Sequence, residues 1–184
     1  MTEPVDEDIK DVSDADMKEF CAAIGELILW ASLIDGQLNR ALVGMMALPH
    51  HVMIEPIVAQ LDPRPKAELL KKRAKIITST DWRNKIRNWV ERAEKVNAKR
   101  NIVAHHGIRV ADGKIMLHSD QLGKIIDSLD TTGDTIKVGE SRSLADIKEW
   151  IEQAKVAFEE GQNVVANLGR FREAALAKLD ASKA

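Results

Sequence analysis

The sequence predicts an all-α protein in the main: a four-helix up-and-down bundle with two long and two shorter helices and a small β-hairpin insertion. Apolar residues recur at steps of three and four along most of the chain, and after Gly107 the period changes to two. The 184 residues are 45% hydrophobic and 30% charged, as expected for one globular domain with a buried core. We expect a flexible acidic arm over residues 1–12, the bundle over 13–178 with its hairpin insertion at about 107–140, and a frayed tail over 179–184.

The first long helix is expected to begin at Ser13 or Asp14 and to stop before Pro49, a length of about 30 residues. Its apolar stripe includes Cys21, which we therefore expect to be buried and inert. The stripe consists of Met17, Phe20, Cys21, Ile24, Leu27, Ile28, Ala31, Ile34, Leu38, Ala41, Leu42 and Met45.

Two shorter helices and a third, longer one are expected next. Residues 50–60 predict a short helix or a helical turn, interrupted by Pro56. Asp62-Pro63-Arg64-Pro65 predicts a turn that starts a basic helix ending near Ile77. Ser79-Thr80-Asp81 caps the next helix, which ends before Gly107. Its stripe is Ile86, Trp89, Ala93, Val96, Arg100 and Val103. Trp82 and Trp89 are predicted to be core or interface anchors rather than base-stacking platforms.

The period of two predicts a β-hairpin from Ile108–Val110 and Lys114–Leu117, with Asp112-Gly113 in its turn. Residues 135–138 could supply a third short strand. Ser143-Leu144-Ala145-Asp146 has the pattern of a capping box and opens the last helix. Its predicted stripe is Leu144, Ile147, Ile151, Ala154, Phe158, Val165, Leu168 and Leu176.

Charge and composition narrow the function classes. The net charge is −2, yet from Arg64 to Arg100 there are 13 Lys or Arg against 4 acidic residues, a local balance of +9. Such asymmetry indicates either a side that faces a polyanion or solvated helix faces balanced by acidic neighbours. No apolar run is long enough to span a membrane, the N-terminus does not resemble a secretory signal, and the single Cys suits a reducing cytoplasm. We therefore expect a cytoplasmic protein without a membrane partner.

Arg100 breaks the pattern of its helix, because its position calls for an apolar side chain. A guanidinium there is desolvated unless an acidic or polyanionic partner compensates its charge. Asn101 follows directly, and His105 and His106 come at the helix end, where carbonyl groups stabilise positive charge. Arg can hold the charge of a pentacoordinate phosphorus and His can transfer a proton, so this set suits cleavage of RNA without a metal.

The spacing adds a geometric condition. At about 100° per residue, Arg100 and His105 lie roughly 140° apart on an ideal helix. They converge if the helix frays, if the Arg stem curls, or if the two chains of a dimer contribute to one cleft. We expect such a dimer to form through the helix that carries Trp89, Val96 and Arg100.

The segment Arg100-Asn101-x-x-x-His105 resembles the signature of the HEPN family, which has an Arg, a polar residue and a His at the end of a helix in a four-helix bundle. The helical order is similar over residues 14–178. The resemblance implies a homodimer with facing motifs that cuts RNA without metal or other cofactor, as a toxin or phage-defence effector with an antitoxin or other regulatory partner. It implies catalytic roles for Arg100, Asn101 and His105, with His106 as the rival of His105. It also implies an acidic residue on the first long helix, for which Asp35 is the candidate and Glu26 the competitor.

Basic side chains around the motif are expected to bind the RNA backbone: Lys99, Lys95, Arg92 and Arg109. Two structural alternatives stay open, a buried bridge from Arg100 to Asp35 and a His105 that only complements the helix dipole. The competing function is a non-catalytic HEPN-like module that binds RNA, a nucleotide or a partner protein, and a dimeric scaffold is the third. The doublets His50-His51 and His105-His106 lack the spacing of a structural zinc site, so no metal is expected.

Overall fold

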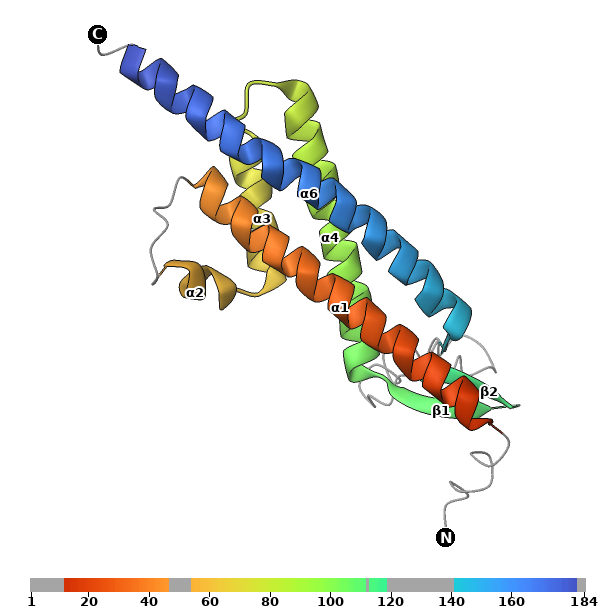
Figure 1. Cartoon of the computed structure of the whole chain (residues 1–184). Coiled ribbons are helices and arrows are strands. Elements are labelled where there is room, and N and C mark those ends of the chain that lie inside the picture. Colours follow the sequence, from red (N-terminus) through yellow and green to blue (C-terminus); the bar gives the residue numbers. More distant parts are fainter. Residues whose placement is uncertain (1–11, 47–53, 112, 119–140, 182–184) are drawn as a thin grey trace, which may run out of the picture. The chain divides into compact units, whose positions relative to one another are not determined.

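The computed structural model describes residues 12–46, 54–111, 113–118 and 141–181. Within these residues the chain forms five helices and a three-stranded antiparallel sheet (Figure 1), which confirms the mainly helical class with a small β insertion. The chain divides into two compact units. The hairpin unit comprises Met1–Ile28 and Lys99–Glu152, and the helical unit comprises Leu29–Ala98 and Gln153–Ala184.

Several predicted features lie outside the described residues. These are the acidic arm up to residue 11, the doublet His50-His51, the strand at 135–138 and the last three residues of the tail.

Helix α1, Asp14–Met45, begins and ends as predicted. Ser13 caps it: the Ser13 hydroxyl accepts a hydrogen bond from the Asp16 backbone N–H at 3.1 Å and donates to Asp16 Oδ2 at 2.7 Å. The prediction of a buried Cys21 is wrong, because its side chain is exposed. On this turn of the helix the buried residues are Phe20 and Ala23, and Cys21 lies outside the buried face.

Helices α2, Ile54–Ala59, α3, Pro63–Ala74, and α4, Thr80–His105, follow in the predicted order. Pro63 stands at the start of α3, where its missing N–H costs nothing. The connection between α3 and α4 is fixed by Arg83, whose guanidinium donates to the Ile77 carbonyl oxygen at 3.2 and 2.8 Å. The Ser79 hydroxyl accepts from the Trp82 N–H at 3.4 Å, in line with the predicted cap.

The predicted hairpin is present as strands β1, Gly107–Ala111, and β2, Lys114–His118 (Figure 1). Ala111 pairs with Lys114, so the loop has two residues, and Gly113 adopts a φ of +67° that favours glycine. A third strand, β3, Arg142–Ser143, pairs antiparallel with β2. The side chain of Leu117 in β2 is fully buried, which anchors the sheet in the core of the hairpin unit.

Helix α6, Leu144–Ala181, starts with the predicted capping box and continues three residues beyond the predicted end at 178. Asp146 Oδ2 accepts from the Ser143 backbone N–H and from the Ser143 hydroxyl, both at 2.7 Å. In return, the Ser143 hydroxyl accepts from the Asp146 N–H at 3.3 Å. The hydrogen bond from the Ser143 hydroxyl, followed by that from its backbone, lowers the pKa of Asp146 below the usual 3.8.

In the helical unit, α6 presents small residues to the core. Ala154, Ala157 and Gly161 are buried there, whereas Phe158 and Val165 are only half-buried, so the predicted stripe is wrong at these two positions. Leu168, also predicted, is buried. Gly161 explains the change of register. A Cβ atom at Gly161 would lie 2.1 Å from Gln37 Oε1 and 2.6 Å from Trp89 Nε1, so only glycine permits this packing.

Candidate functional site

The Arg100-Asn101 pair lies in the last two turns of α4, and both side chains are exposed. Arg100 Nη1 donates to Asn101 Oδ1 at 3.0 Å, so the amide orients the guanidinium. The expectation that Arg100 is desolvated within the apolar stripe is therefore wrong. Lys99 occupies the inward position between the buried Val96 and Val103.

The stem of Lys99 is half-buried, and its ammonium lies over the ring of Trp150, 5.6 Å from the centroid. An ammonium on a flexible apolar stem can fill a position at the core edge while its charge stays near water and an aromatic face. Arg142 of β3 approaches the same ring at 5.9 Å. Trp150 thus holds two cations within the hairpin unit.

His105 is the last residue of α4 and is exposed, whereas His106 is half-buried. The backbone N–H of His106 donates to the Ile102 carbonyl oxygen at 2.9 Å, so helical hydrogen bonding continues through the motif. The helix does not fray, which removes one of the three ways in which Arg100 and His105 could converge. Their separation of roughly 140° around the helix axis stands. An exposed imidazole next to solvent suits a proton-transfer role better than the half-buried His106 does.

The hairpin adds a histidine that sequence reasoning missed. His118 is buried on β2, and the strand register places it opposite Gly107, the residue that follows the His105-His106 doublet. His118 Nδ1 lies 3.3 Å from the Ser141 hydroxyl oxygen. Only the hairpin register connects His118 with the motif, and a lone His at the end of a strand carries no signal by itself.

The four predicted RNA-binding cations are divided between the units. Lys99 and the exposed Arg109 of β1 belong to the hairpin unit together with Arg100 and His105. Lys95 and Arg92 belong to the helical unit. Lys95 is exposed, and Arg92 forms an ion pair with Glu160 at 3.3 Å in which both side chains are more than one-third exposed.

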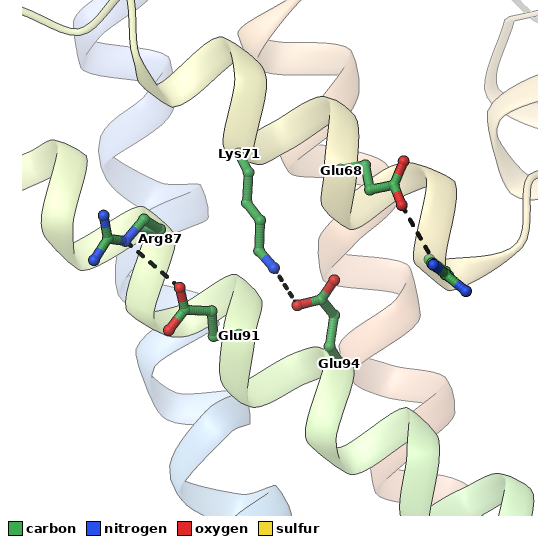
Figure 2. Close-up of polar contacts among 6 residues, drawn as sticks. Glu68, Lys71, Arg87, Glu91 and Glu94 are labelled. Atoms are coloured by element: carbon green, nitrogen blue, oxygen red, sulfur yellow. Dashed lines mark hydrogen bonds and ion pairs between the residues drawn. The ribbon is translucent and has the colours of Figure 1, made fainter.

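Ion pairs engage many of the charged side chains of residues 64–100 (Figure 2). Within this segment, all four acidic residues have a basic partner, and Lys71 of α3 binds Glu94 of α4. The other three pairs are of the i, i+4 kind, on α3 or α4: Arg64–Glu68, Lys85–Asp81 and Arg87–Glu91. These pairs leave the local balance of +9 unchanged, because the four acidic residues are already counted in it. Two acidic residues outside the segment do offset it, through the pairs Lys66–Asp35 and Arg92–Glu160, so acidic neighbours account for part of the asymmetry. Lys95, Lys99 and Arg100 lie toward the end of α4 that carries the motif.

Asp35, the candidate acidic partner, is bound elsewhere in the helical unit. Both of its carboxylate oxygens accept from Lys66 Nζ at 2.9 Å. The Lys66 side chain is fully buried and that of Asp35 is 32% exposed. Asp35 therefore has a structural role that needs no contribution from Arg100. Glu26, the competitor, is exposed on α1.

The predicted dimer surface also needs correction. Trp89 is fully buried and Val96 is 2% exposed, so both side chains pack in the core of their own chain. A dimer built on these two side chains is excluded. The exposed residues at the end of α4 are Arg100, Asn101, Ala104 and His105.

The described part of the chain contains no group of three or more His, Cys, Asp or Glu side chains placed to hold a metal ion. None of its helices has the length and apolar composition needed to cross a bilayer. Comparison with models of protein families, with curated proteins and with solved structures gave no match to this chain.

Proposed function

We propose that this protein is a metal-independent endoribonuclease of the HEPN type, with its active site at the end of α4. One observation carries the proposal: Arg100, Asn101 and His105 are all exposed on the last turns of one helix, with Arg100 held by Asn101. An exposed Arg that is oriented by an amide, instead of neutralised by a carboxylate, keeps its charge available for a phosphate.

The reaction follows from these side chains. His105 removes the proton from a 2′-hydroxyl, whose oxygen attacks the adjacent phosphorus. The P–O5′ bond breaks, and the leaving 5′-oxygen takes a proton from a second imidazole. Arg100 stabilises the additional negative charge on the pentacoordinate phosphorus, and Asn101 fixes its guanidinium in place. The products are a 2′,3′-cyclic phosphate and a free 5′-hydroxyl.

The geometry favours a site shared by two chains. Because α4 stays helical through His105, the Cα–Cβ bonds of Arg100 and His105 in one chain point to different faces of the helix. A two-fold dimer that pairs the exposed ends of α4 brings two Arg and two His together. His105 then acts as base and His105 of the partner subunit as acid. In sedimentation experiments we expect about twice the chain mass of 20.5 kDa.

The RNA backbone is expected to contact the cations of the hairpin unit that surround the motif, Lys99 and Arg109. Lys95 and Arg92 are the candidates for the same role on the helical unit. A ribonuclease of this kind acts in the cytoplasm, where a toxin or defence effector needs an antitoxin or other regulatory partner to restrain it. An antitoxin that covers Arg100 and His105 would meet that need.

The alternative function is a non-catalytic HEPN-like module that binds RNA, a nucleotide or a partner protein. The divergence of Arg100 and His105 around α4 favours this alternative if the chain stays monomeric, because a monomer then offers phosphate binding without a base in line.

The decisive experiment incubates the full chain with single-stranded RNA in excess EDTA and identifies the product ends. We expect cleavage that survives EDTA and leaves 2′,3′-cyclic phosphates, because the nucleophile is the 2′-hydroxyl. An all-deoxy strand of the same sequence is the matched control and should resist. RNA that is bound but not cut would select the non-catalytic module, and cleavage of the deoxy strand would contradict the proposed chemistry.

A further inference from the structure

A groove lies between α4 and α6 within the helical unit, away in sequence from the motif. Its volume is about 220 Å³, and its lining combines one aromatic ring, two cations, two amides, one carboxylate and one apolar side chain. The lining residues are Trp82, Lys85, Asn88, Arg92, Glu160, Asn163 and Val164. Of these, only Arg92 belongs to the cations already assigned to RNA.

Trp82 is the aromatic wall of the groove. Its side chain is half-buried, unlike that of the fully buried Trp89. Trp89 is therefore a core anchor as predicted, whereas Trp82 lies at the edge of the core with part of its ring exposed. Lys85 Nζ lies 5.0 Å from the centroid of the Trp82 ring and 2.9 Å from Asp81 Oδ2. The side chains of this ion pair are 53% and 69% exposed, so water screens the pair and its exchange for another anion costs little.

The rest of the groove has an apolar floor and polar side chains around it. Val164 is buried at 3% exposure, whereas Asn88 and Asn163 are exposed. Asn163 Oδ1 accepts from Asn167 Nδ2 at 2.8 Å, which orients this amide. Amides carry a donor and an acceptor side by side, as do the edges of nucleobases.

We propose that this groove binds one nucleotide unit, with the base stacked on Trp82 and the phosphate held by Lys85 and Arg92. The base takes the place of Lys85 Nζ over the indole, and the displaced ammonium binds the phosphate. The volume is below the roughly 300–1,000 Å³ typical of pockets that enclose drug-sized ligands, so it suits one base with its phosphate. The inference rests on the proposed function in one respect, that the nucleotide belongs to the RNA strand being cut.

The test measures binding without cleavage. The full chain carrying His105→Ala is titrated, in EDTA, into a fluorescein-labelled single-stranded RNA 12-mer, and anisotropy is recorded. Trp82→Ala should weaken binding about 5- to 150-fold, the range for loss of one stacked base. Trp82→Phe, which keeps an aromatic face, should retain most of the affinity. Unchanged far-UV circular dichroism and melting temperature show that each variant is folded.

Lys85→Ala and Arg87→Ala form a matched pair. Each removes one cation of α4 that is paired with an acid four residues away, but only Lys85 lines the groove. Lys85→Ala should weaken binding several-fold and lower the salt slope by about 1, whereas Arg87→Ala should stay within about twofold of the parent. Equal effects of Lys85→Ala and Arg87→Ala, or full affinity of Trp82→Ala, would overturn the proposal.

Competing ligands identify the source of the nucleotide. If AMP displaces the RNA, and if Trp82→Ala weakens the binding of AMP, the groove also binds a free mononucleotide, which supports the proposed base and phosphate contacts. If an acidic peptide binds equally well through Trp82 and Lys85, the groove serves a protein partner and the proposal fails. Cleavage by the wild type is measured separately. RNA binding that depends on Trp82, without any cleavage, would support the nucleotide groove and contradict the ribonuclease proposal. Cleavage together with binding that does not depend on Trp82 would support the ribonuclease and contradict the nucleotide groove.

Discussion

The middle and the end of α4 differ in how many of their side chains are buried. Between Ile86 and Val96, α4 buries Trp89, Val90 and Ala93 at 1% exposure or less. From Arg100 to His105 it exposes four of six side chains, although helical hydrogen bonds continue to the end. The difference shows that apolar periodicity locates the part of the helix that stabilises the fold, and that the same helix can continue beyond that part with most of its side chains exposed to water.

This contrast has an energetic consequence. Side chains that lose their contact with water in the core cost several kcal/mol when removed, while exposed side chains away from special features change stability by about 0.5 kcal/mol or less. Substitutions in the core should therefore lower the free energy of unfolding, and substitutions of the exposed residues at the end of α4 should leave it nearly unchanged.

Asp35→Asn is expected to have the largest effect on stability. It leaves the Lys66 ammonium, fully buried, without its ion-pair partner, which costs about 3 kcal/mol at the lower end of the range for buried pairs because Asp35 is itself 32% exposed. Urea unfolding at neutral pH measures the change. Asp81→Asn, which breaks the exposed pair with Lys85, is the matched control and should cost at most about 0.5 kcal/mol. Equal losses in the two variants would show that Lys66 is accessible to water.

Gly161→Ala should have the second-largest effect on stability, because it adds a methyl group to the core that contains Trp89. Its Cβ atom would collide with Gln37 Oε1 and Trp89 Nε1, and repacking should cost about 1–3 kcal/mol. Gly25→Ala on α1 is the control, since a Cβ there meets nothing within 4 Å and the change should stabilise the helix slightly. A neutral Gly161→Ala would mean that α6 does not pack this closely in solution.

Ser143→Ala should have a smaller effect, about 1 kcal/mol, through loss of the capping box of α6. The pKa of Asp146 is lowered in the folded chain, so its stabilising contribution is fully present above the unfolded value of 3.8 and is lost as pH falls through the folded value. Unfolding free energies measured from pH 6 downward should therefore show a weaker acid dependence in Ser143→Ala than in the wild type. Parallel curves would contradict the assigned cause of the shift.

The sequence predicted the helices, their caps and the hairpin well, because these features depend on local chemistry. Ser13, Ser79 and Ser143 cap helices through their own hydroxyls, and Gly113 occupies the turn position that needs a positive φ. Local signals of this kind are complete within a few residues, so no tertiary information is needed to interpret them.

The predictions were wrong at positions where packing between distant segments determines which side chain is buried. On α6 the sequence favoured the bulky Phe158, but the core takes Ala157 and Gly161 because Gln37 and Trp89 approach closely. On α4, Lys99 occupies the inward position between Val96 and Val103, with its ammonium over the ring of Trp150, and Arg100 is exposed. The partner of Asp35 could not be predicted either, since a buried Lys66 looks like any other residue of a basic helix.

The central claim is that the end of α4 is a ribonuclease site rather than a structural feature, and one paired measurement tests it most directly. Arg100→Ala and His105→Ala are assayed for RNA cleavage and for the free energy of unfolding on the same preparations. We predict cleavage reduced at least about 100-fold in both variants, with unfolding free energies within about 0.5 kcal/mol of the wild type. Variants that cleave RNA as the wild type does, or that lose several kcal/mol of stability, would contradict the claim.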